Sequence, residues 1–315
     1  MKLTRVQFAK FLTELPNCIV AMEACASAHH WGREAEALGL TVRLVPAIYV
    51  KPFVRRQKND AADAEAIAEA ALRPSMRFFA VKTEAQQAQA VVFRSRELLV
   101  KQRTQLINAL RGHLAEFGIL LPDQRASVAR MLAACRELGE DKIAPQVHDM
   151  VRTYADQIET LTAKVTAIDA SICKDALKDG ETRRLRTMPG VGPVTAMAIR
   201  AFCPEAQSFE NRRAFAAWLG LVPRQHSTGG RTRLGRITKM GQADVRRLLI
   251  VGAMSVISVG ARKGRCDDPW LARMLTRRPR MVVAVALANR MARRLWAMLA
   301  HERDYVRDHE PQTAA

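Results

Sequence analysis

The sequence has few aromatic residues, no long apolar run and no paired cysteine motif. Aromatic side chains make up 5% of its 315 residues, which argues against binding of single strands mainly by base stacking. No apolar stretch reaches membrane-spanning length and the first residues do not resemble a secretory signal, so we expect no membrane anchor. The six cysteines are scattered without C-x-x-C spacing, which predicts reduced, mostly buried thiols in a cytoplasmic protein and no structural zinc.

Positive charge is abundant. The chain carries 50 Lys and Arg against 31 Asp and Glu, a net charge of +19, while 49% of its residues are hydrophobic. The hydrophobic content supports a folded core, and the charge exceeds what solubility needs. The positive charge therefore predicts a polyanionic partner. Nucleic acid is the commonest such partner, and an anionic membrane surface is the alternative.

The most distinctive stretch runs from residue 219 to 249. Ser227 and Thr228 stand directly before Gly229 and Gly230, and no acidic residue occurs nearby until Asp244. The surrounding cationic side chains are Arg224, Arg231, Arg233, Arg236 and Lys239, together with the imidazole of His226. A hydroxyl nucleophile among guanidinium groups is suited to attack on a phosphodiester. The alternative is a solvated basic loop in which Ser-Thr-Gly-Gly only forms a turn.

The first 50 residues show the rhythm of an α/β unit. A helical pattern over 3–15 precedes a short apolar strand at 18–22, a helix over 29–38 and a second strand beginning at 41. Strand–helix–strand order predicts parallel strands.

Three carboxylates are associated with this α/β unit. Asn59 is a good N-cap for an alanine-rich helix that Pro74 ends, and Asp60 and Asp63 project from one face of its first turn. Glu23 ends the neighbouring strand. Converging at a sheet edge, Glu23, Asp60 and Asp63 would suit Mg²⁺; alternatively, the two aspartates only complement the helix dipole.

The middle of the chain is helical. A tract over 84–120 precedes the clearest periodic signal, in which apolar residues alternate steps of four and three. They are Val147, Val151, Tyr154, Ile158, Leu161, Val165, Ile168 and Ile172. We call this set the heptad seam, and its spacing predicts a coiled coil. The partner is either the helix at 84–120 or the same helix in a second copy.

The C-terminal third combines apolar helices with basic loops. Residues 189–193, Pro-Gly-Val-Gly-Pro, lie between two helical segments and resemble a helix–hairpin–helix turn, in which the amides of Gly190 and Gly192 can receive a phosphate. A plain tight turn is the alternative. Residues 309–315 are typical of a disordered tail.

Five motifs carry a recognisable pattern: KNDAADAEAI at 58–67, MEACASAHHW at 22–31, LINALRGHLAEFG at 106–118, PGVGPVTA at 189–196 and GLVPRQHSTGGRTRLGRITKMG at 220–241. Together they resemble the IS110 family of insertion-sequence transposases, in its IS1111 branch. The resemblance implies an α/β and mostly α fold: a RuvC-like (RNase H-like) domain over 1–82, long coiled-coil helices over 83–182, a helical transposase domain over 183–300, and a tail over 301–315.

The resemblance also implies site residues and partners. Glu23, Asp60 and Asp63 match the last three members of an Asp-Glu-Asp-Asp metal set, and Ser227 matches the catalytic serine. The first Asp and its strands have no counterpart in this sequence, so the RuvC-like domain is expected to be N-terminally incomplete. The implied partners are DNA and a structured guide RNA. Strand exchange between two DNA duplexes needs several catalytic serines. Because each chain supplies one, a dimer or tetramer is expected. A RuvC-like metal nuclease and an inactive nucleic-acid-binding remnant are the alternative functions.

Overall fold

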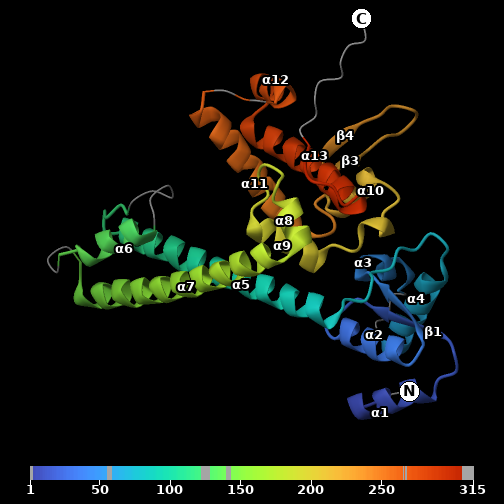
Figure 1. Ribbon diagram of the computed structural model, residues 1–315. Coiled ribbons are helices and arrows are strands. Elements are labelled where there is room, and N and C mark those ends of the chain that lie inside the picture. Colours follow the sequence, from blue (N-terminus) through green and yellow to red (C-terminus); the bar gives the residue numbers. More distant parts are fainter. Residues whose placement is uncertain are drawn as a thin grey trace, which may run out of the picture. The chain divides into compact units, whose positions relative to one another are not determined.

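The computed structural model describes residues 3–54, 59–121, 128–139, 143–264, 266 and 268–306 (Figure 1). The chain divides into two compact units, Met1–Ala88 and Gln89–Ala315. The boundary between the units, after Ala88, lies close to position 83, where the long helices are expected to begin. The predicted tail at 309–315 lies outside the described residues. Within the ranges just given, no helix is both long and apolar enough to cross a membrane.

The first unit is built on a small parallel sheet. Its elements are α1 (Arg5–Glu14), β1 (Ile19–Glu23), α2 (Ala28–Ala37), β2 (Thr41–Val45), α3 (Ala47–Val50), the short 3₁₀ turn η1 (Lys51–Phe53) and α4 (Asp60–Leu72). Strands β1 and β2 pair in parallel, with Ile19 opposite Thr41 and Glu23 opposite Val45. The predicted parallel strand–helix–strand unit is confirmed.

Two hydrophobic clusters hold this unit together. In one of them Val45 packs with Ala66, Ala70 and Ala71 of α4. In the other, Ala35 of α2 packs with Leu12 and Leu40. Helix α4 begins where the sequence predicts, because the Asn59 side chain accepts a hydrogen bond from the amide of Ala62 at 2.8 Å.

Long helices make up the first part of the second unit, and α5 starts shortly before the unit boundary at Gln89. Helices α5 (Glu84–Ala115), α6 (Val128–Arg136) and α7 (Pro145–Lys178) bury a common cluster that includes Leu110, Leu114, Met131, Val151 and Ile158. Further along the pair, Arg96 of α5 donates to Asp169 of α7, with Nη2 and Oδ2 at 3.0 Å.

The heptad seam is covered within the chain. All eight of its residues are buried or half-buried, and Val151, Ile158, Val165 and Ile172 are the most enclosed. Ile158 lies in the cluster with α5 and α6, whereas Ile172 joins the C-terminal core together with Phe93 of α5. Of the two partners that the sequence left open, α5 of the same chain is the one that the structure provides.

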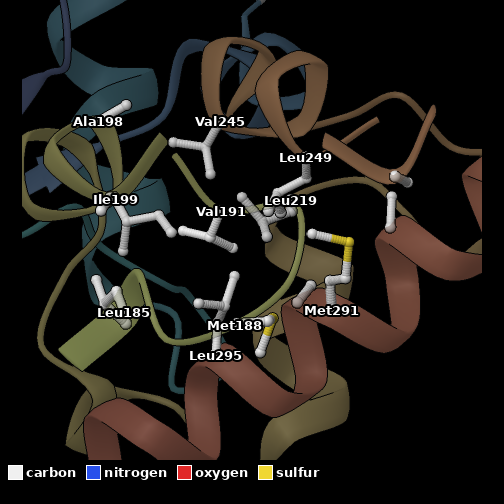
Figure 2. Close-up of a cluster of buried hydrophobic side chains, with 14 of the residues drawn as sticks. Leu185, Met188, Val191, Ala198, Ile199, Leu219, Val245, Leu249, Met291 and Leu295 are labelled. Atoms are coloured by element: carbon white, nitrogen blue, oxygen red, sulfur yellow. The ribbon is translucent and has the colours of Figure 1, made fainter. Parts of the chain in front are cut away.

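The C-terminal core is formed by short and medium helices around two central ones. They are α8 (Gly180–Leu185), α9 (Pro193–Phe202), η2 (Ala206–Ser208), α10 (Arg212–Trp218), α11 (Ala243–Arg262), α12 (Pro269–Arg277) and α13 (Arg280–Ala300), with strands β3 (Pro223–Gln225) and β4 (Leu234–Ile237). Figure 2 shows Val191, Ile199 and Leu219 converging with Leu249 of α11 and Leu295 of α13. This core is the base from which the β3–β4 segment extends.

Candidate functional site

The stretch singled out in the sequence folds as a β-hairpin. Strands β3 and β4 are antiparallel, with Gln225 opposite Leu234. At the tip, Thr228 bridges Arg231, whose amide donates to the Thr228 carbonyl at 3.0 Å. Gly229 and Gly230 have φ of +54° and +75°, the left-handed conformations that a tight two-residue hairpin turn requires. The glycine pair therefore closes the turn, and Ser227 lies one residue before it.

Ser227 is exposed, and its hydroxyl oxygen accepts two hydrogen bonds. The Gln225 side chain donates Nε2–H to Oγ at 2.9 Å, and the backbone amide of Arg233 donates at 3.2 Å. Both donors stabilise negative charge on that oxygen. Neither the Gln225 amide nitrogen nor the Arg233 amide can accept the hydroxyl proton, so neither could act as a general base for Ser227.

Gln225, rather than His226, is the side chain beside Ser227. The backbone stays extended here, since the amide of His226 donates to the Arg233 carbonyl at 2.8 Å. Successive side chains of an extended segment point to opposite faces, so Gln225 and Ser227 share one face. The His226 ring lies on the other face against Gly235, where an added Cβ would be 3.3 Å from His226 Cδ2. Sequence reasoning missed Gln225, although its i, i+2 spacing from Ser227 was the available signal.

The base of the hairpin is fixed to the core by backbone contacts that only glycine permits. Gly220 and Gly241 have φ of +70° and +86°. A Cβ on Gly220 would lie 2.0 Å from the Met240 carbonyl oxygen, and one on Gly241 would lie 1.8 Å from that of Trp218. The two chain segments that enter and leave the hairpin are therefore in direct backbone contact.

Arg246 of α11 connects the same two segments. Its Nη1 donates to the Leu219 carbonyl at 2.9 Å and to the Met240 carbonyl at 3.4 Å. Partial burial lowers the pKa of the Arg246 guanidinium, and the charge of Asp244 partly offsets this. The guanidinium nevertheless stays charged at neutral pH. Arg246 thus ties the hairpin base to the helix that follows it.

The predicted phosphate-binding cations all lie exposed on the hairpin or at its base. Arg224 already uses Nη2 to hold the Thr238 carbonyl at 3.2 Å across the hairpin. Lys239, two residues after the end of β4, has a left-handed φ of +55°. No ion pair of the described residues involves Arg224, Arg231, Arg233, Arg236 or Lys239. Their charges are therefore not neutralised within the part of the chain that the structure describes.

The second glycine motif has a packing role that the sequence did not reveal. Gly190, with φ of +86°, lies against α11 and α13. A Cβ there would be 2.8 Å from the Gly252 carbonyl oxygen and 3.0 Å from Met291 Cε. This contact explains why a glycine occupies position 190. Gly192 is exposed with open space around its Cα and stands as the N-cap of α9, so it is the better placed of the two to meet a phosphate.

The three predicted metal ligands occupy neighbouring elements but do not form a metal group. Glu23 is half-buried at the end of β1, Asp60 is exposed at the start of α4, and Asp63 is half-buried one turn later. Among the residues with described positions, no set of three or more His, Cys, Asp or Glu is gathered closely enough to hold a metal ion. Helix α4 buries Ala66 and Ala70, beyond its first turn. The predicted convergence of these carboxylates is therefore not found here.

Comparison with known proteins decides the family. Residues 182–266, which include the hairpin, match the model described as "Transposase IS116/IS110/IS902 family", and residues 3–119 match a second model, of DEDD-type IS110 transposases. A "Probable family 20 transposase" of Pseudomonas aeruginosa is 45% identical over 96% of this chain and 90% of its own length. The chain belongs to the IS110 family of transposases.

Other relatives of this IS110-family chain are named as transposases too. The transposase for insertion sequence element IS1328 of Yersinia enterocolitica is 38% identical over 94% of this chain and 88% of its own length. The transposase for IS1111A of Coxiella burnetii is 33% identical over 96% of this chain and 84% of its own length. The two family models leave residues 120–181, which contain all of α6 and α7, between their matched ranges.

Proposed function

We propose that this chain is an insertion-sequence transposase of the IS1111 branch that cuts and rejoins DNA with Ser227 as its nucleophile. The observation that supports this most strongly is the hairpin. It presents an exposed hydroxyl, held by two hydrogen-bond donors, among arginines that no acidic side chain of the described residues neutralises. The family relationship supports the reaction class, and the hairpin geometry supports the choice of residue.

In the proposed reaction, the Ser227 oxygen forms a bond to a backbone phosphorus while the bond from phosphorus to one sugar oxygen breaks. The serine proton passes to solvent and the departing sugar oxygen takes up a proton from solvent, so the products are a phosphoserine-linked strand end and a free sugar hydroxyl. The Gln225 side chain and the Arg233 amide favour the anionic form of the attacking oxygen. Arg231 and Arg236, exposed on the same hairpin, are suited to hold the non-bridging phosphate oxygens. Rejoining reverses these bond changes with another strand's hydroxyl.

The RuvC-like assignment of the first unit and its metal belong to this proposal as well. Its support is the match of residues 3–119 to a DEDD-type family, together with the parallel β1–β2 pair and the three carboxylates near it. Glu23, Asp60 and Asp63 would hold a divalent ion, in our proposal Mg²⁺, which would supply charge for positioning a phosphate. Because the three carboxylates are not gathered, no step above depends on the ion.

Metal binding is testable without activity. In a calorimetric titration, the full chain should bind Mn²⁺, used as a substitute for Mg²⁺. The Asp63→Asn variant should lose this binding. Asp244→Asn, which removes an acid from α11, is the matched control and should bind as the original chain does. Binding that is equal in both variants would remove Asp63 from the metal site.

The proposed partners are the DNA of the element ends and target, a structured guide RNA, and further copies of the chain. The unneutralised charges on the hairpin support binding of nucleic acid. An assembly remains part of the proposal because exchange between two duplexes needs more than one serine. We do not assign this assembly to the most enclosed residues of the heptad seam, since Val151, Ile158, Val165 and Ile172 are buried within a single copy.

The serine assignment is tested by comparing neighbouring hydroxyls. Ser227→Ala should abolish strand cleavage by the full chain with its nucleic-acid partners, because the attacking oxygen is removed. Thr228→Val, the matched control, removes the adjacent hydroxyl and keeps a β-branched side chain, so it should retain cleavage. Cleavage that survives in Ser227→Ala would contradict the proposal and favour a metal-dependent nuclease.

A further inference from the structure

A second group of arginines lies outside the hairpin, where α10 begins and α13 passes beside it. Arg212 and Arg213 are the first two residues of α10, and Arg293 belongs to α13. All three side chains are exposed. We call these three residues the arginine cluster.

The two helices hold the cluster together in an antiparallel arrangement. Asn289 of α13 donates Nδ2–H to the Leu221 carbonyl, just after the end of α10, at 3.0 Å. Two turns further along α13, Trp296 donates Nε1–H to the Ala206 carbonyl, before the start of α10, at 3.0 Å. Arg293 lies between these two anchors, one turn after Asn289, and so is level with the first part of α10.

The backbone at the start of α10 is equally well fixed. The Asn211 side chain accepts hydrogen bonds from the amides of Arg213 and Ala214 at 2.9 and 3.0 Å. Phe215 and Ala216, one turn later, are buried against the C-terminal core. Arg212 and Arg213 are therefore carried by a rigid element, with only their side chains free to adapt.

No ion pair within the described residues neutralises the arginine cluster. Arg290 of α13, which is close by, is paired with Asp268 at 2.9 Å, but no ion pair to Arg212, Arg213 or Arg293 is formed there. The proximity has an electrostatic signature: partial burial lowers the pKa of Arg293, and the charges of Arg212, Arg213 and Arg290 lower it further. Guanidinium groups that repel one another are stabilised when an anion of high charge density lies between them.

We propose that the arginine cluster binds the phosphate backbone of a nucleic-acid strand that continues from the hairpin. It is close to the hairpin base, because α10 has seven residues and is therefore about 10 Å long. Leu221, whose carbonyl accepts a hydrogen bond from Asn289, lies two residues before β3. The direction of the strand, toward Ser227, rests on the proposed function, whereas binding by the cluster does not.

The test is the salt dependence of binding, measured by fluorescence anisotropy with a DNA duplex and with an RNA duplex of the same sequence. The triple variant Arg212→Gln, Arg213→Gln and Arg293→Gln should lower the slope of log affinity against log salt. For three lost phosphate contacts on DNA the slope should change by about 2.7. The drop in affinity between 50 and 200 mM salt should therefore become about 40-fold smaller.

Two further variants make the result specific. The triple Lys variant at the same positions keeps the charge and should keep most of the slope. A matched control removes three charges from exposed positions of α7, by Arg152→Gln, Lys164→Gln and Lys174→Gln, and should leave the slope nearly unchanged.

The two duplexes distinguish the source of the phosphate. A slope that changes with DNA alone, with RNA alone or with both supports the proposal and names the strand that is bound. An unchanged slope with both duplexes, or an equal change in the α7 control, overturns it. Ser227→Ala keeps all three arginines of the cluster and should bind both duplexes with an unchanged salt dependence. The binding test therefore remains valid even if Ser227 is not the nucleophile.

Discussion

The glycines at the base of the hairpin should be far less replaceable than those at its tip. Gly229, Gly230 and Gly241 all have positive φ, so alanine at each costs about 1–2 kcal/mol of left-handed strain. At Gly229 and Gly230 no atom lies within 4 Å of an added Cβ, so alanine there should cost only the backbone strain. At Gly241 the added Cβ would lie 1.8 Å from the Trp218 carbonyl oxygen, and such overpacking adds about 1–3 kcal/mol.

Gly241→Ala should therefore lower the free energy of unfolding by about 2–5 kcal/mol, and Gly230→Ala by about 1–2 kcal/mol. Urea unfolding of the full chain followed by circular dichroism measures both. Hydrogen exchange locates the damage: the amides of Thr238 and Gln242, which donate to Val222 and Trp218, should lose protection in the Gly241 variant only. Equal destabilisation by the two variants would refute the idea that the base is the fixed end of the hairpin.

Three other predictions concern Arg246 at the hairpin base, Ile158 in α7 and Asp179 before α8. Arg246→Met should slow strand cleavage and leave affinity for DNA within about 1 kcal/mol, because it loosens the hairpin base; unchanged cleavage kinetics would contradict this. Ile158→Asp should destabilise the chain by several kcal/mol in urea unfolding, because Ile158 is fully buried. A variant that stays folded and loses only its assembly would instead favour Ile158 as a contact between copies of the chain. Asp179 is partly desolvated, which raises its pKa, but hydrogen bonds from Thr182 and the charge of Arg200 outweigh this and lower it. Asp179→Asn should therefore lose stability above pH 4, with a cost that disappears as the pH falls through the folded-state pKa; a cost independent of pH would contradict the charge argument.

Much of the helical structure was predictable because local signals and tertiary contacts agree. Asn59 caps α4 as its side chain and position suggest, and the four-three spacing on α7 gives the buried face of a long helix. The partner of α7 was not predictable, because periodicity shows which face is buried and not what covers it. Helix α12 was missed although Asp268 caps it, accepting hydrogen bonds from the amides of Trp270 and Leu271.

The sequence suggests which residues could form the candidate site, but it says little about their geometry. Ser-Thr-Gly-Gly marks a turn, but the flanking strands have few apolar residues, so the alternation that indicates a hairpin is weak. The contact of Gly190 with Gly252 joins residues far apart in the sequence, and nothing local indicates it. The carboxylates Glu23, Asp60 and Asp63 are correctly assigned to neighbouring elements, but whether they converge depends on how α4 packs on the sheet.

The most direct test of the central claim is the chemical identity of a trapped protein–DNA intermediate. The full chain is incubated with its nucleic-acid partners and a DNA substrate whose nick prevents rejoining. It is then denatured, digested and analysed by mass spectrometry. Our account predicts a nucleotide attached through phosphate to Ser227, and no adduct in Ser227→Ala. An adduct on Thr228 or on any other residue, or cleavage without an adduct, would contradict it.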